Sequence, residues 1–239
     1  MRTLQSPFAT YDPRTAPITQ TDMDMAAVPL DRLTPEALRD RFEAPPAWEP
    51  EVRQEPVYMK RDPTSAGVLV PLVERTEGVM VLLTERSKAL STHSGQVAFP
   101  GGQADAHDLD IADTALREAR EEVGLDRRFV TVIGELPVYE TGSQFQVTPV
   151  VGLVREGFAL RANAAEVADV FEVPLAFLMD PAHHRHHETW MGGRMRHWLS
   201  MPYAAPSDLD TGPDRAPHER FIWGATAGML RNLYRFLIA

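Results

Sequence analysis

Three glutamates near the middle of the chain are the residues most able to do chemistry together. Glu118, Glu121 and Glu122 follow a loop that begins with Gly101 and Gly102. On a helix, at about 100° per residue, the three glutamates fall within roughly one third of the circumference. The spacing therefore predicts a helix with one acidic face, preceded by a glycine-rich loop.

This acidic face would be unfavourable without a cation. Carboxylates about 6 Å apart repel by roughly 3 kcal/mol per pair at an effective dielectric constant near 20. A hard divalent ion, Mg2+ or Mn2+, takes oxygen ligands and reverses the sign of this interaction. Arg117 can orient one or two of the carboxylates. A solvated acidic surface is the alternative, and the joint spacing of glycines, arginine and glutamates favours the metal site.

The same stretch resembles the signature box of the Nudix hydrolases, G-x5-E-x7-R-E-U-x-E-E-x-G-U, in which U is a bulky apolar residue. The matching positions are Gly102, Arg117, Glu118, Glu121, Glu122, Gly124 and Leu125. Asp108 stands at the first acidic position, with eight residues rather than seven before the arginine, and Ala119 replaces a bulky residue. The resemblance implies metal ligation by the three glutamates and by a backbone carbonyl of Gly101 or Gly102.

The segments before the box narrow the resemblance to one branch of the family. Residues 82–87 and 95–102 are similar to the signature L-L-T-x-R-S-x3-R-x3-G-x3-F-P-G-G of the coenzyme A pyrophosphatases, except that Ser91 stands at the second arginine. Similar segments continue from about Ala66 to the C-terminus. The resemblance implies hydrolysis of the diphosphate of coenzyme A, giving 4'-phosphopantetheine and adenosine 3',5'-bisphosphate. ADP-ribose, a dinucleotide or a nucleoside triphosphate is the alternative substrate.

Four residues outside the box are candidates for the site. Arg86 is the leading candidate for a phosphate contact, because guanidinium matches phosphate oxygens in a bidentate geometry, and a structural salt bridge is its alternative. His93 and Gln96 either donate hydrogen bonds to the substrate or hold their loop. Glu166 precedes a predicted strand, where it is either a further ligand, the general base or a surface glutamate.

Length, composition and charge set limits on the protein. A chain of 239 residues with 44% hydrophobic and 24% charged residues forms one sizeable domain. The net charge of −10 argues against a general nucleic-acid surface. There is no cysteine, and no apolar run approaches the length of a membrane span. We therefore expect a cytoplasmic protein. The family resemblance implies a small coenzyme A-like nucleotide as its partner and leaves room for a homodimer.

The N-terminal quarter of the chain differs from the rest. Residues 1–60 hold many prolines, and their one clear signal is a helix over 33–42 with Thr34 as N-cap and Pro35 at the first helical position. We interpret this region as an extension that lies on the domain or on a partner subunit, and a disordered tail is the alternative. Residues 61–239 are then the Nudix domain.

The pattern of apolar residues predicts an α/β domain. A hairpin over 67–84 comes before the acidic helix, and more strands and a final helix follow it; their ranges are 129–139, 145–154, 166–175 and 223–237. Two helices on opposite faces of a mixed sheet make an α/β/α sandwich, which is also the fold that the Nudix resemblance implies.

Two other interpretations of the sequence are less favoured. His183, His184, His186 and His187 invite a zinc site, but nothing nearby completes familiar tetrahedral spacing, so a solvated loop without metal is preferred. No G-x-S-x-G motif supports a serine hydrolase. A non-catalytic Nudix domain that senses a metabolite is disfavoured because the arginine and the three glutamates are all present.

Overall fold

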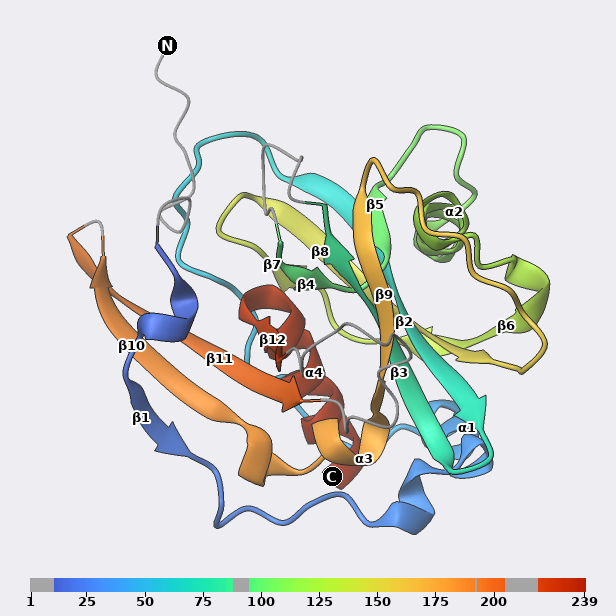
Figure 1. Cartoon of the computed structure of the whole chain (residues 1–239), viewed down its shortest axis with the longest axis horizontal. Helices are drawn as coiled ribbons and strands as arrows, with labels where there is room; N and C mark the ends of the chain where they lie inside the picture. The colour runs from blue at the N-terminus through green and yellow to red at the C-terminus, as the bar shows by residue number, and fades with distance from the viewer. Residues whose placement is uncertain (1–10, 88–94, 192, 205–218) are drawn as a thin grey trace, which may run out of the picture.

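A mixed β-sheet forms the centre of the protein in this computed structural model, which describes residues 11–87, 95–191, 193–204 and 219–239 (Figure 1). Its main strand order is β4-β3-β2-β8-β6, with β5 on β2, β7 on β8 and β9 on β3. The strands are β2 (Thr64–Arg75), β3 (Gly78–Arg86), β4 (Val97–Ala98), β5 (Gly101–Gln103), β6 (Val130–Glu135), β7 (Tyr139–Glu140), β8 (Phe145–Val154) and β9 (Val167–Pro174). Strands β2 and β8 run parallel, whereas β3 is antiparallel to β2.

The predicted hairpin is confirmed as β2 and β3, which join where Arg75 pairs with Gly78. Its residues alternate between the two faces of the sheet because successive side chains of a strand point in opposite directions. On β2, Val70 and Leu72 belong to one apolar core, while Leu69 and Val73 belong to the other. The sheet is therefore buried on both faces, as in a sandwich.

Helix α2 (Ile111–Val123) covers one face of the sheet and is the predicted acidic helix. It begins at Asp110, whose side chain accepts a 2.7 Å hydrogen bond from the Asp113 amide. It ends at Gly124, which has φ 72° and therefore adopts the left-handed conformation that glycine accommodates best. Ala115 and Ala119 pack against the sheet. The small size of these alanines lets the helix lie close to the strands.

The opposite face is covered by α4 (Gly224–Ile238) and by a second, antiparallel sheet (Figure 1). The order of this sheet is β1-β10-β11-β12, and its strands are β1 (Ile18–Thr21), β10 (Arg185–Met191), β11 (Arg194–Ala204) and β12 (Glu219–Trp223). The central sheet and its two helices confirm the α/β/α prediction. The second sheet was not predicted, because arginines and histidines interrupt the apolar alternation of β10 and β11.

The prediction that His183, His184, His186 and His187 form a solvated loop is wrong, because these residues take part in the second sheet and its packing. His184 is fully buried, with its Nε2 2.8 Å from the Leu178 carbonyl, and His187 is 2.7 Å from the Ser200 hydroxyl through Nε2. Burial lowers the pKa of His184 to about 4. A neutral imidazole therefore fills a position in the core.

Residues 11–63 lie on the domain rather than extending away from it, and Val28, Leu33 and Leu38 belong to its core. They contain α1 (Pro35–Glu43), and Thr34 caps this helix as predicted by accepting a hydrogen bond from the Ala37 amide at 3.2 Å. The other short helices are η1 (Pro13–Thr15), η2 (Leu30–Leu33), η3 (Arg127–Phe129), α3 (Leu175–Leu178) and η4 (Pro181–His183). No helix of the described residues is long and apolar enough to cross a membrane.

A buried ion pair connects this N-terminal segment to α4. Arg231 lies 2.8 Å from Asp22, and their side chains are 3% and 4% exposed. Arg231→Met is expected to lower the free energy of unfolding by about 3 to 5 kcal/mol, because the buried Asp22 would lose its guanidinium partner and keep only its contacts with His186 and Gln20. Urea denaturation measures this, with Arg235→Met as the control, since Arg235 is 42% exposed and should change stability by less than about 0.5 kcal/mol. An equal, small loss in both variants would contradict the expectation.

Candidate active site

The predicted site residues come from four neighbouring parts of the fold. Strand β5 pairs with β2 and presents Gly102 to α2, which carries Glu118 (Figure 1). A Cβ atom at Gly102 would lie 2.6 Å from the Glu118 carboxyl carbon, so any larger residue here would displace the Glu118 carboxylate. The end of β3 brings Arg86 to Glu122. The turn before β9 carries Glu166.

Glu122 is the most buried of the three helical carboxylates, with 4% of its surface exposed. One oxygen accepts a 3.2 Å hydrogen bond from the Gly101 amide, and the other lies 3.7 Å from the Arg86 guanidinium. Burial raises the pKa of Glu122 to about 7, and the charges of Glu118 and Glu166 act in the same direction. The Gly101 amide and Arg86 therefore do not fully offset the cost of burying the negative charge of Glu122.

Glu118 and Glu121 differ from Glu122 in their surroundings. Glu118 is 16% exposed, and burial raises its pKa despite a 2.8 Å ion pair with Arg117. The charges of Glu121 and Glu166 add to this increase. The Glu121 side chain is 58% exposed and lies 3.3 Å from Arg117. Two of the glutamates are thus partly desolvated, and the third faces solvent.

Arg117 holds the acidic loop and the acidic helix together. Its guanidinium donates to both oxygens of Asp108, at 2.8 and 3.0 Å, and also to the Gln103 carbonyl at 3.2 Å. These hydrogen bonds keep the pKa of Asp108 well below its usual range. The extra residue between Asp108 and Arg117 is therefore accommodated by the loop, and the acidic position of the box still meets its arginine.

Arg86 lies at the end of β3, beside Glu122. The pairing of β3 with β9 shifts register between Glu85 and Arg86, and such an irregularity re-aims a side chain. Within the described residues, the Arg86 Nε atom is buried and has no hydrogen-bond partner. The Arg86 amide donates to the Gln96 carbonyl at 2.9 Å, which places Gln96 beside it. His93 and Ser91 lie outside the described residues.

The charge of Glu166 raises the pKa of both Glu118 and Glu122. The Glu166 backbone carbonyl accepts a 2.7 Å hydrogen bond from the Ser87 amide, which fixes the turn before β9 to the end of β3. Its carboxylate accepts a 3.1 Å hydrogen bond from the side-chain amide of Asn163. Asn163 was missed from the sequence, and a polar residue in the loop three positions before Glu166 was the only available signal.

The residues of this site fit a hard divalent cation by their chemistry. Every candidate ligand is oxygen, and the raised pKa values of Glu118 and Glu122 show that their negative charge is incompletely neutralised. Among the described residues, no three histidine, aspartate or glutamate side chains are already gathered for a metal ion. The carboxylates are bonded instead to Arg117, Arg86 and the Gly101 amide.

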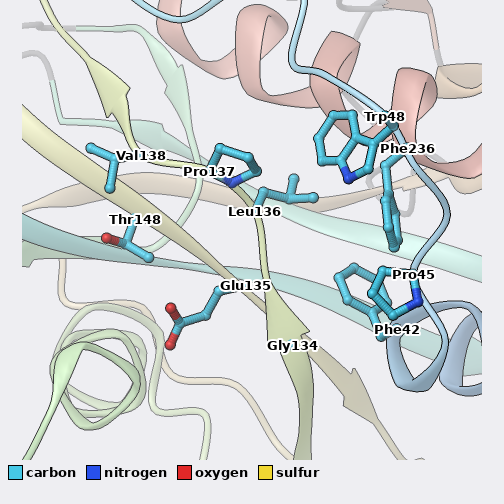
Figure 2. Close-up of a pocket in the computed structure, with 10 residues that line it drawn as sticks. All are labelled: Phe42, Pro45, Trp48, Gly134, Glu135, Leu136, Pro137, Val138, Thr148 and Phe236. Carbon is cyan, nitrogen blue, oxygen red and sulfur yellow. The ribbon is translucent and has the colours of Figure 1, made fainter.

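A groove of about 470 Å3 lies elsewhere, at the β6 edge of the central sheet. Figure 2 shows Trp48 and Phe236 on one side of it, with Val138 and Thr148 on the other and Glu135 between them. None of the site residues predicted from the sequence lines this groove. The candidate site is therefore defined by the carboxylates of α2 and not by this hollow.

Comparison with known proteins identifies the family. The NUDIX domain model matches residues 63–208, which is more than half of the chain. A protein of Yersinia enterocolitica described as an uncharacterized Nudix hydrolase NudL is 40% identical over 168 residues, covering 70% of this chain and 78% of its own. A protein of Salmonella heidelberg with the same description is 36% identical over 203 residues, covering 84% and 94%.

Solved structures give partial likenesses. A Nudix hydrolase from M. smegmatis, RenU, has a TM-score of 0.43 and 26% identity, covering 48% of this chain and 73% of its own. A C. elegans Ap4A hydrolase has a TM-score of 0.41 and 18% identity, covering 50% and 85%.

The family match and the NudL relatives show that the chain belongs to the Nudix family. It is an enzyme, a Nudix hydrolase. Hydrolases of this family generally use divalent metal ions, which agrees with the all-oxygen character of the candidate site.

Proposed function

We propose that this enzyme hydrolyses the diphosphate of coenzyme A or its derivatives, with Mg2+ or Mn2+, to 4'-phosphopantetheine and adenosine 3',5'-bisphosphate. The observation that carries the proposal is the position of Arg86. This arginine belongs to the coenzyme A signature, and its guanidinium lies 3.7 Å from Glu122. Its Nε atom is buried and has no hydrogen-bond partner among the described residues. A guanidinium there can bind a phosphate oxygen beside the acidic helix.

The proposed roles divide the residues of the site into three groups. Glu118, Glu121 and Glu122, with a backbone carbonyl of Gly101 or Gly102, would hold the divalent ion. Arg86 binds the substrate diphosphate, and His93 and Gln96 belong to the same substrate loop. Arg117 keeps the ligands in place through its contacts with Glu118 and Asp108. Glu166 is a further ligand or the base that takes the proton of the attacking water.

The proposed reaction is an in-line displacement at phosphorus. When bound, the divalent ion would make a water molecule more acidic and neutralise charge on the diphosphate. The chain itself orients the diphosphate through Arg86 and excludes water from Glu122, which is buried. A carboxylate with its pKa raised to about 7 also gains negative charge within the neutral pH range.

A substrate panel tests the proposal. Pure protein is incubated with Mg2+ or Mn2+ and with coenzyme A, ADP-ribose, a dinucleotide or nucleoside triphosphates, and the products are separated by chromatography. Adenosine 3',5'-bisphosphate and 4'-phosphopantetheine in equal amounts are the expected products of coenzyme A. Repeating the reaction in 18O-labelled water identifies the phosphorus atom that is attacked, because only one product then gains the label.

The controls separate the rival functions. Glu121→Gln protein prepared in the same way should form product at least about 100-fold more slowly, which excludes a contaminating enzyme. Turnover of another substrate with coenzyme A left intact would overturn the substrate assignment and leave the diphosphatase chemistry. Absence of turnover with every substrate would favour a metabolite sensor. The cytoplasmic location, the homodimer and the domain boundary near residue 60 stay predictions.

A further inference from the structure

The segment between β8 and β9 carries Asn163 and lies against the end of α2. The Arg161 amide donates to the Val123 carbonyl at 2.8 Å, and the Asn163 amide donates to the Glu122 carbonyl at 2.8 Å. These carbonyls belong to the last turn of α2, which has no further helical amides to satisfy them. The turn is thus bonded directly to the part of the helix that carries Glu122.

The side chain and the carbonyl of Asn163 form hydrogen bonds within this turn. Its side-chain oxygen accepts from the Ala165 amide at 3.2 Å, and its side-chain nitrogen donates to a Glu166 carboxylate oxygen at 3.1 Å. Its carbonyl accepts from the amides of Glu166 and Val167 at 2.9 and 2.8 Å. A side chain at this position must therefore accept and donate at the same time, which asparagine can do and aspartate cannot.

Glu166 needs such a restraint because it lies close enough to Glu118 and Glu122 to repel both of them. A glutamate side chain without a partner would turn toward solvent, away from these like charges. The Asn163 amide opposes this movement. A hydrogen bond from an amide to an ionised carboxylate is stronger than one between neutral groups, so it can hold the side chain in place.

We propose that Asn163 is a positioning residue, which links the backbone of Glu122 to the carboxylate of Glu166 and so keeps Glu166 beside the acidic helix. The proposal rests on the proposed function in one respect, namely that Glu166 acts as a metal ligand or as the base. In this proposal Asn163, which lies outside the Nudix box, sets the distance between α2 and the Glu166 carboxylate.

Two substitutions at Asn163 separate its role in the turn from its role toward Glu166. Asn163→Asp keeps the oxygen that accepts from the Ala165 amide but loses the donor to Glu166, whereas Asn163→Ala loses both. Both variants are expected to lower kcat or weaken Mn2+ binding by about 10- to 100-fold, as substitutions of residues that orient metal ligands do. Mn2+ binding is measured by titration calorimetry without substrate, and thermal unfolding of the metal-free proteins checks the fold. Ala164→Asp, at an exposed position, is the control for an added negative charge.

A double-mutant cycle with Glu166→Gln tests whether Asn163 acts through Glu166. In the Glu166→Gln background, Asn163→Asp is expected to change kcat and the Mn2+ dissociation constant by less than about twofold, since the interaction it removes is already altered. The proposal is overturned if the full loss persists in that background, if Asn163→Asp behaves as wild type, or if Ala164→Asp causes the same loss. The assays use whichever diphosphate the wild-type enzyme cleaves, so a failure of the coenzyme A assignment is recognised separately.

Discussion

Glu122→Gln is expected to lower kcat by about 1,000-fold, the largest effect of any substitution considered. The change removes one negative charge from a buried position while keeping almost the same shape. Electrostatic stabilisation of a transition state by a metal site contributes several kcal/mol, and about 4 kcal/mol corresponds to a factor of about 1,000. Steady-state kinetics at saturating metal measure the loss, and Glu77→Gln, in the exposed turn between β2 and β3, is the matched control.

The same substitution should stabilise the metal-free protein at neutral and alkaline pH. The pKa of Glu122 is about 7 in the folded protein and 4.5 is the ordinary value, so the folded state holds a proton that the unfolded state has released. The wild-type protein therefore loses stability as pH rises from about 4.5 to 7, by up to about 3 kcal/mol. Glutamine at position 122 does not ionise, so the variant does not lose this stability as pH rises. In EDTA, the variant should unfold at higher denaturant concentration than wild type at pH 8, and the difference should vanish near pH 4.5.

Metal binding should show the opposite dependence on pH. A divalent ion competes with the proton of Glu122, so the affinity of the wild-type enzyme should fall about tenfold per pH unit below 7. Calorimetric titration with Mn2+ at several pH values measures this slope. A pH-independent affinity in the wild type, or an undiminished slope in Glu122→Gln, would show that Glu122 is not the group that binds the ion.

Glu121→Gln is expected to reduce kcat by about 100-fold or more while the fold stays intact. Glu121 is 58% exposed, so its substitution removes a ligand charge without opening the core. The free energy of unfolding should therefore change by less than about 0.5 kcal/mol, as for surface substitutions in general. The expected result is a large loss of activity at nearly constant stability, which distinguishes a ligand from a packing residue.

Asp113→Asn is the matched control for this prediction. Asp113 lies on the same helix, but its carboxylate pairs with Arg127 at 2.9 Å rather than with Arg117. Its substitution removes the same charge from α2 at a distance from the cluster and should leave kcat within about twofold, because exposed ion pairs contribute little. A wild-type rate in Glu121→Gln would mean that the metal lies elsewhere.

The elements of the central sheet were predictable because their periodicity is local. Alternating apolar residues predicted β2, β3 and β8, and the helical spacing of Ala115 and Ala119 predicted α2 up to Gly124. The second sheet was not predictable in this way. Its strands β1 and β10 are far apart in sequence and pair through backbone hydrogen bonds, which depend little on side-chain pattern.

The sequence by itself determined the chemical character of the site. Three glutamates at helical spacing beside glycines produce an all-oxygen, acidic face in any fold that forms the helix, since the spacing alone places them together. This is why the type of enzyme was predictable from one short stretch of the chain. The spacing of Gly102, Glu118 and Glu122 along the chain was enough to predict an acidic metal site.

Only the tertiary structure decided how differently the three carboxylates behave. Burial against β5 and the end of β3 raises the pKa of Glu122 to about 7, whereas Glu121 on the same helix faces solvent. The turn of Asn163 brings Glu166 to the helix from more than 40 residues away. Burial and such long-range contacts depend on how the sheet, helix and turn pack against one another, and no short stretch of sequence encodes that packing.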